Sequence, residues 1–472
     1  MKFNGLAGLL SLGLGIALAL SGLACNRKSS WQQLTPAAAK NTRLAWNQKT
    51  LLDVYKQSGF SDARWDDSVQ TAFDEFARSR AGLLDPGETY GDTISDGCQT
   101  AISVGCKDPM IAYLYARFGP ARGRDAHTIA MAYLDAAKRM QSSSYPDIRK
   151  FYASLRAVNQ LYDADGTNVD QNEINQAGDV EGLLLSAIQN QTMPPDEAYE
   201  ACSEALADYD ATPEYYTNFY ARIETVLNRN WPADSQTWLL KGEAFIAMAW
   251  QARGSGYADT VTPDGAKLFD QRLVLARKYL EYAWKLNPQD GRIPRHMLTV
   301  ELGQGSGRDG MELWFSRAMK LNSNDYAACS AKLQYIEPKW YGSTDEMLKF
   351  GRECATNPNW NGEVPLVLVD AHVSIQRQYA SDANKADYWK QPDVWSDIQT
   401  AFDRFFELNP DATGWYHNYT WFAYQAGQWD KLNELLPKLG PVNYNYFGGK
   451  DAFEQMVQLA KEHARTSSAA NK

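Results

Sequence analysis

The C-terminal half of the chain repeats one pattern of apolar and polar positions. Four segments carry apolar residues at three- and four-residue steps: residues 272–286, 309–321, 344–356 and 394–408. This spacing places the apolar side chains on one face of an α-helix. Each segment is followed at once by an asparagine and then by Pro or Ser, a common way to end a helix. The pattern therefore predicts four helices, each stopped so that the next can fold back.

The stops recur at a nearly constant distance. Pro288, Ser323 and Pro358, which follow three of the asparagines, are 35 residues apart, and Pro410 comes 52 residues after Pro358. A period near 34 residues is typical of tetratricopeptide repeats, each a pair of helices. The longer interval fits one period plus the polar insertion at residues 381–393.

One unit resembles a tetratricopeptide repeat at individual positions. The second helix of that family has a small residue, a bulky one four further on, a small one three beyond, and then proline after five more. Ala276, Leu280, Ala283 and Pro288 fit these positions. The resemblance implies an all-α fold over residues 191–465, an α-solenoid of antiparallel helix hairpins. Residues 251–270 are expected to be a loop dividing the two helices of this unit.

The N-terminal half is predicted to be helical but less regular. Four further stretches have helical spacing: residues 65–81, 109–118, 126–140 and 147–162. No stretch alternates apolar and polar residues as a strand would. We interpret residues 46–190 as an irregular helical region and residues 466–472 as a flexible tail.

The first residues are typical of an export signal. Lys2 is followed by an apolar stretch over residues 6–20, and small residues lead to Cys25. This resembles the lipobox of bacterial lipoproteins, although Gly22 stands where that family prefers Leu. The resemblance implies cleavage after residue 24, lipidation of Cys25, a tether over residues 25–45, and an exported, lipid-anchored protein on the periplasmic or outer-membrane side. The alternative is an ordinary secretory signal that ends near a cysteine.

Composition narrows the class of partner. The chain is 44% hydrophobic and 22% charged, in the range of globular proteins, and its net charge is -10. An acidic body has no electrostatic attraction to nucleic acid. The 15 Trp, 26 Tyr and 17 Phe residues suit thick helix interfaces and, equally, an aromatic binding surface.

Export would favour disulfides among the remaining cysteines. Cys98 and Cys106 lie eight residues apart, and Cys329 and Cys354 fall on the two predicted helices of one hairpin, so each pair is a candidate disulfide. Cys202 would stay free. The alternative is that all five are small buried apolar residues.

One acidic stretch resembles a calcium-binding loop. Asp163, Asp165, Thr167 and Glu173 are candidate oxygen ligands between two predicted helices. The spacing departs from the EF-hand, because Asn168 stands at the glycine position and Glu173 comes one residue early. An Asp- and Gly-rich turn has the same composition without binding metal. No other cofactor is expected.

Two loops are candidate binding sites, since insertions between repeat helices often carry recognition. One contains Arg253, Ser255 and Tyr257, and the other contains Trp340 and Tyr341. The alternative is that these aromatic residues only pack on neighbouring helices. Together with Cys329, the two loops look like a group of uncharacterised exported bacterial repeat proteins, a likeness that implies no activity.

No linear catalytic motif occurs in the sequence. We therefore expect a non-catalytic, membrane-anchored protein-interaction scaffold of the bacterial cell envelope, whose partner is another envelope protein or peptide. The alternative is a surface lipoprotein that binds a glycan or small ligand through aromatic side chains.

Overall fold

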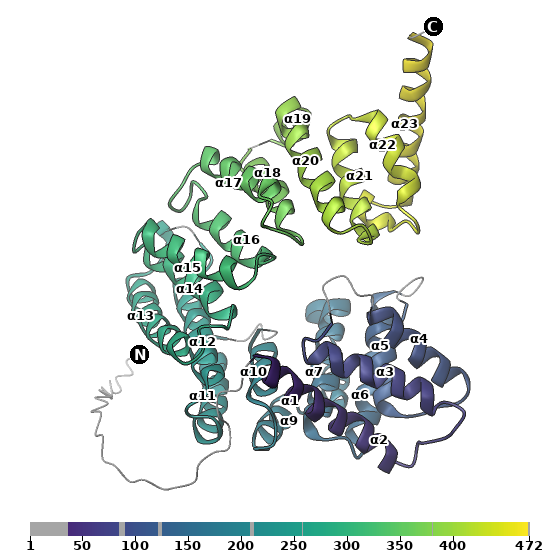
Figure 1. Ribbon diagram of the computed structural model, residues 1–472, viewed down its shortest axis with the longest axis vertical. Coiled ribbons are helices and arrows are strands. Elements are labelled where there is room, and N and C mark those ends of the chain that lie inside the picture. The colour runs from purple at the N-terminus through teal and green to yellow at the C-terminus, as the bar shows by residue number, and fades with distance from the viewer. Residues whose placement is uncertain are drawn as a thin grey trace, which may run out of the picture. The chain divides into compact units, whose positions relative to one another are not determined.

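All regular structure in the described part of the chain is helical, as the apolar spacing predicts (Figure 1). The computed structural model describes residues 36–84, 90–120, 125–207, 212–256, 258–379 and 381–470. No strand occurs among these residues, and none of their helices is both long and apolar enough to cross a membrane.

The N-terminal helices are α1 (Pro36–Gln48), α2 (Val54–Gln57), α3 (Asp66–Arg80), α4 (Tyr90–Ser103), α5 (Pro109–Phe118), α6 (Ala126–Gln141), α7 (Asp147–Asp165), α8 (Gln171–Ala177), α9 (Val180–Ile188) and α10 (Pro195–Ala207). A π-helical turn, Lys49–Asp53, joins α1 to α2. α1 begins inside the segment that the sequence suggests is a tether.

The helices that follow are α11 (Pro213–Asn230), α12 (Ser235–Arg253), α13 (Pro263–Leu286), α14 (Arg292–Gln304), α15 (Arg308–Leu321), α16 (Tyr326–Tyr335), α17 (Thr344–Thr356), α18 (Val367–Gln376), α19 (Asp382–Trp389), α20 (Pro392–Leu408), α21 (Tyr416–Gln425), α22 (Trp429–Leu435) and α23 (Lys450–Ala470). α19 forms within the polar insertion, and α23 extends into the segment expected to be a tail.

The predicted loop over residues 251–270 is shorter than expected. α12 ends at Arg253 and α13 already begins at Pro263, because the Thr262 hydroxyl accepts a hydrogen bond from the Gly265 amide and caps the new helix. Proline at the first helical position is also favourable, since it has no amide hydrogen to leave unpaired. The expectation of a loop up to residue 270 is therefore wrong.

Three of the four repeated asparagines end their helices in one common way, whereas the fourth, Asn409 after α20, donates through its side-chain amide to the Gly362 and Phe405 carbonyls. Asn287, Asn322 and Asn357 each follow the last residue of α13, α15 and α17. In each case the side-chain oxygen accepts a hydrogen bond from the backbone amide two residues on, at 3.0 to 3.1 Å. This bond turns the backbone away from the helix and so sets the direction of the next one.

Small residues allow the paired helices to approach closely. A Cβ atom on Gly242 of α12 would lie 2.5 Å from the Leu280 Cγ atom of α13, so no larger residue fits. Ala276 and Ala283, one turn to either side of Leu280, are fully buried. The small and bulky positions of the predicted repeat unit thus form the contact between α12 and α13.

Contacts also link helices that are not consecutive. α12 contacts α14, α14 contacts α16, and α16 contacts α18, in addition to the contacts between each helix and the next. In the N-terminal region α3 packs on α4, α6 on α7, and α7 on α9. Apolar side chains from these faces form the buried core.

Candidate functional site

The structure brings the two candidate binding loops together. Arg253, the last residue of α12, places its guanidinium 5.7 Å from the centre of the Trp340 ring, which lies in the turn between α16 and α17. The same guanidinium lies 5.6 Å from the Trp250 ring, and the two indoles meet edge to face at 5.9 Å. We call Trp250, Arg253, Trp340 and Tyr341 the aromatic–arginine cluster.

Local backbone structure positions both parts of the cluster. Gly254 ends α12 with a positive φ of 77°, and the Arg253 Nη1 group donates hydrogen bonds to the carbonyls of Gly254 and Gly256. On the other side, the Trp340 amide donates to the Glu337 carbonyl at 2.8 Å and the Tyr341 amide to the Tyr335 carbonyl at 3.1 Å. The turn and the guanidinium are therefore held before any ligand arrives.

Tyr341 connects the cluster to α14, one of the four helices between the two loops. Its hydroxyl donates a hydrogen bond to the Leu302 carbonyl near the end of α14, at 3.0 Å, while 43% of the residue stays exposed. Gly305 makes room for it, because a Cβ there would lie 2.7 Å from the Tyr341 hydroxyl. The C-terminal ends of α12, α14 and α16 thus lie near one another at this cluster.

Three polar atoms beside the cluster are buried without a hydrogen-bond partner among the described residues. They are the indole nitrogens of Trp250 and Trp340 and the side-chain oxygen of Gln251. A buried donor without a partner costs about 1–3 kcal/mol, so such atoms call for an explanation. Of the other predicted binding residues, Ser255 is exposed and Tyr257 lies outside the described residues.

The chemistry available at the cluster is binding rather than acid–base catalysis. It presents aromatic rings and one cation, a set that suits a ligand with apolar and hydrogen-bond-accepting parts. Burial raises the pKa of Tyr341, which keeps its hydroxyl protonated.

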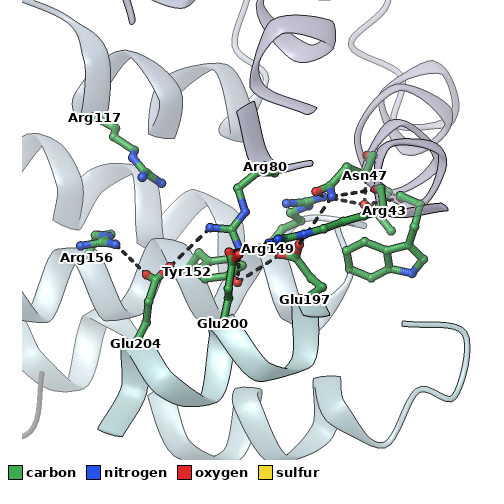
Figure 2. A network of polar contacts seen from close by, with 12 residues as sticks. Arg43, Asn47, Arg80, Arg117, Arg149, Tyr152, Arg156, Glu197, Glu200 and Glu204 are labelled. Atoms are coloured by element: carbon green, nitrogen blue, oxygen red, sulfur yellow. Dashed lines mark hydrogen bonds and ion pairs between the residues drawn. The ribbon is translucent and has the colours of Figure 1, made fainter. Parts of the chain in front are cut away.

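A second constellation, which the sequence reasoning missed, lies between α1, α3, α7 and α10 (Figure 2). Glu197 on α10 is fully buried and accepts from Arg43 of α1 at 2.8 Å and from Arg80 of α3 at 2.7 Å. Arg149 of α7 is also buried and donates to Asn47 at 2.6 Å and to Thr50 at 2.7 Å. We call this the buried charge network.

The charges in the network support one another. Burial alone would raise the pKa of Glu197, but Arg80, Arg43 and Arg149 outweigh it and hold that pKa well below its ordinary value. Burial lowers the pKa of Arg149 to about 10, still above neutral pH. The network joins four helices and is structural in character.

A signal for this network is present in the sequence. Glu197, Glu200 and Glu204 follow one another at three- and four-residue steps, so they share one face of α10. Glu200 pairs with Arg43, and Glu204 with Arg156 at 2.6 Å. An acidic face on a helix rich in buried alanines indicates cationic neighbours, but not which ones.

The calcium-like stretch is partly helical. α7 continues to Asp165, a 3-10 turn spans Gly166–Asn168, and Glu173 lies in the first turn of α8. Asp163 accepts a hydrogen bond from Gln160. In the described part of the chain, no group of three His, Cys, Asp or Glu side chains is placed to hold a metal ion. Calcium binding through Asp163, Asp165, Thr167 and Glu173 stays a prediction.

The cysteines of both candidate pairs are buried thiols and lie near each other. Burial raises the pKa of Cys98 to about 12, and the nearby Cys106 thiol adds to the shift. Burial also raises the pKa of Cys354, whose thiol hydrogen-bonds with that of Cys329. Disulfide formation within each pair stays a prediction, and Cys25 lies outside the described residues.

Comparisons with known proteins give no family name. No protein-family model matches the sequence, and no curated protein matches it.

Proposed function

We propose that this chain is a non-catalytic, membrane-anchored scaffold of the bacterial cell envelope, built from tetratricopeptide-like helix pairs. The observation that carries the proposal is the common ending of α13, α15 and α17 on a capping asparagine. The contacts from α12 to α14, α14 to α16 and α16 to α18 support it, because stacked repeats place equivalent helices side by side.

The partner in this proposal is another envelope protein or a peptide, and the aromatic–arginine cluster is its contact point. Tyr341 is exposed, and Trp340 and Arg253 beside it are partly exposed, so they offer an aromatic face and a cation to a bound segment. Aromatic and arginine side chains dominate the binding energy of many protein interfaces.

The test compares two exposed tyrosines. The full-length protein is crosslinked mildly in cells and purified from membranes, as wild type, Tyr341→Ala and Tyr162→Ala. Tyr162 is 49% exposed on α7, against 43% for Tyr341, so it is a matched control. We expect a partner band that Tyr341→Ala loses and Tyr162→Ala keeps. Equal recovery with all three chains would refute the cluster as the contact point.

The anchor is tested separately. Changing Cys25 to Ser should move the protein from the membrane fraction to the soluble fraction, because the acyl chains contribute about 0.8 kcal/mol per buried methylene. If the Ser variant stays on the membrane, the lipoprotein part of the proposal is wrong.

A glycan ligand is the second candidate, and the exposed Tyr341 ring next to the partly exposed Trp340 ring favours it. Sugars offer hydroxyl acceptors together with apolar ring faces that pack on aromatic side chains. Retardation of the protein on polysaccharide gels, lost in Trp340→Ala, would support this reading. Unretarded migration on a panel of envelope polysaccharides would exclude it.

A further inference from the structure

A small cavity lies far along the sequence from the aromatic–arginine cluster, between the end of α4, the loop that follows it, α5 and α6. Its volume is about 230 Å³. Small side chains leave this space, since Ala112 and Ala116 of α5 and Ala132 of α6 line one wall. Ile102 and Tyr115 complete an apolar lining.

Three exposed apolar side chains lie on or beside the segments that line the cavity. Ile102, Val104 and Met131 are each more than one-third exposed, and all three lie on or next to its lining segments. Clustered exposed apolar side chains are uncommon on a monomeric surface and often mark a binding site. An apolar ligand group would cover them.

Among the charged side chains that line the cavity, only Lys107 has no ion-pair or hydrogen-bond partner among the described residues. Arg139 and Asp135, which both line it, are paired with each other at 2.7 Å. The buried Asp108 carboxylate already accepts from the amides of Met110 and Ile111, at 2.9 and 3.1 Å, and from the Tyr145 hydroxyl. Lys107 is exposed and has no ion-pair partner among the described residues.

We propose that this cavity binds a small monocarboxylate with an apolar body, its carboxylate beside Lys107 and its carbon chain against the alanine wall. A cavity of about 150 Å³ holds the six heavy atoms of benzene, so the present one has room for about nine. A saturated acid of about six carbons fits this size. An amine would meet no free anion here, since Asp108 and Asp135 are both engaged.

The test uses hexanoate as the probe and the full-length chain, with binding followed by isothermal titration and ligand-observed NMR. We expect saturable binding with a Kd below about 20 mM, the value that the eight non-hydrogen atoms of hexanoate reach at about 0.3 kcal/mol each. Hexanamide, which has the same chain without the charge, should bind more weakly. Absence of hexanoate binding up to that concentration, or equal affinity for hexanamide, would overturn the proposal.

Two pairs of variants separate the two parts of the site. Lys107→Gln should weaken hexanoate binding about threefold to fivefold, as expected for a solvent-exposed ion pair, while Lys320→Gln should not change it. Ala132→Phe fills the cavity and should weaken binding at least tenfold, whereas Ala221→Phe adds the same side chain to an exposed helix position. Circular dichroism checks that each variant is folded. Unchanged binding in Lys107→Gln or in a folded Ala132→Phe would show that hexanoate binds elsewhere.

Discussion

The replacement Glu197→Gln tests whether the buried charge network holds the N-terminal helices together. The amide has the same shape as the carboxylate but no charge, and one of its two ends is a donor. One of the short contacts, to Arg43 at 2.8 Å or to Arg80 at 2.7 Å, then becomes a donor facing a donor. A hydrogen bond to a charged group contributes about 1.5–3 kcal/mol, and breaking a buried ion pair costs about 3–5 kcal/mol in total.

Glu200→Gln is the matched control. Glu200 lies one turn further along α10 and contacts the same two arginines, but 34% of its side chain is exposed. An ion pair that water can reach contributes about 1 kcal/mol or less. The two variants therefore remove the same charge from the same helix and differ mainly in burial.

Amide hydrogen exchange in α1 and α10 is the direct assay, since it reports opening of these helices even if the whole chain does not unfold in one step. A loss of about 4 kcal/mol corresponds to roughly thousandfold faster exchange. The reasoning is refuted if Glu197→Gln exchanges no faster than Glu200→Gln.

The same network has a defined pH dependence. The pKa of Glu197 is lowered on folding, so its contribution to the free energy of unfolding is complete above the ordinary Glu pKa of 4.5. The contribution declines as the pH falls below that value toward the lower folded pKa. In Glu197→Gln, this decline in the free energy of unfolding at acid pH should be absent.

Three further predictions concern packing, protonation and redox chemistry. Gly351→Ala should lower the free energy of unfolding by about 1–3 kcal/mol in thermal melts, because its Cβ would lie 2.9 Å from a backbone atom of α18, whereas Gly414→Ala meets nothing within 4 Å and should be neutral. Burial raises the pKa of Asp108 from 3.8 to about 6, so the urea midpoint of the wild type should rise as the pH falls from 7 to 4. Asp108→Asn should flatten this rise. The same dependence of the urea midpoint on pH in both proteins would contradict the prediction. If Cys329 and Cys354 form a disulfide, alkylation of the denatured, unreduced wild type should spare both, and Cys329→Ser should expose Cys354 to the reagent; labelling of both in the oxidised wild type would exclude the bond.

Helix positions were predictable because their signals are local. The expected segments 344–356 and 109–118 coincide with α17 and α5. The start of α13 was placed too late, because the polar stretch before it was taken as a loop although Thr262 and Pro263 form a helix-start signal. Apolar spacing alone was too coarse there, and capping chemistry decides the boundary.

The aromatic–arginine cluster and the buried charge network differ in how much of each could be predicted from the sequence. Both halves of the aromatic–arginine cluster were identified as candidate loops, but their contact depends on how the intervening helices α13 to α16 pack, and no local pattern encodes that. The buried charge network joins residues far apart in the chain, such as Arg43 and Glu197, which are 154 positions apart. Pairings of this length follow from the tertiary fold rather than from helix periodicity.

The place of α1 in the network determines how a pull on the N-terminus would reach the rest of the protein. With Cys25 lipidated as proposed, ten residues lie between it and Pro36, and the eleven steps from Cys25 to Pro36 span no more than about 40 Å at full extension. Tension from the membrane would load α1 first, and from Arg43 it would pass directly to Glu197 on α10 without crossing the helices between them. The anchored end would thus be secured by a crosslink to the middle of the chain, so peeling α1 away would require rupture of buried ion pairs before any repeat helix moved.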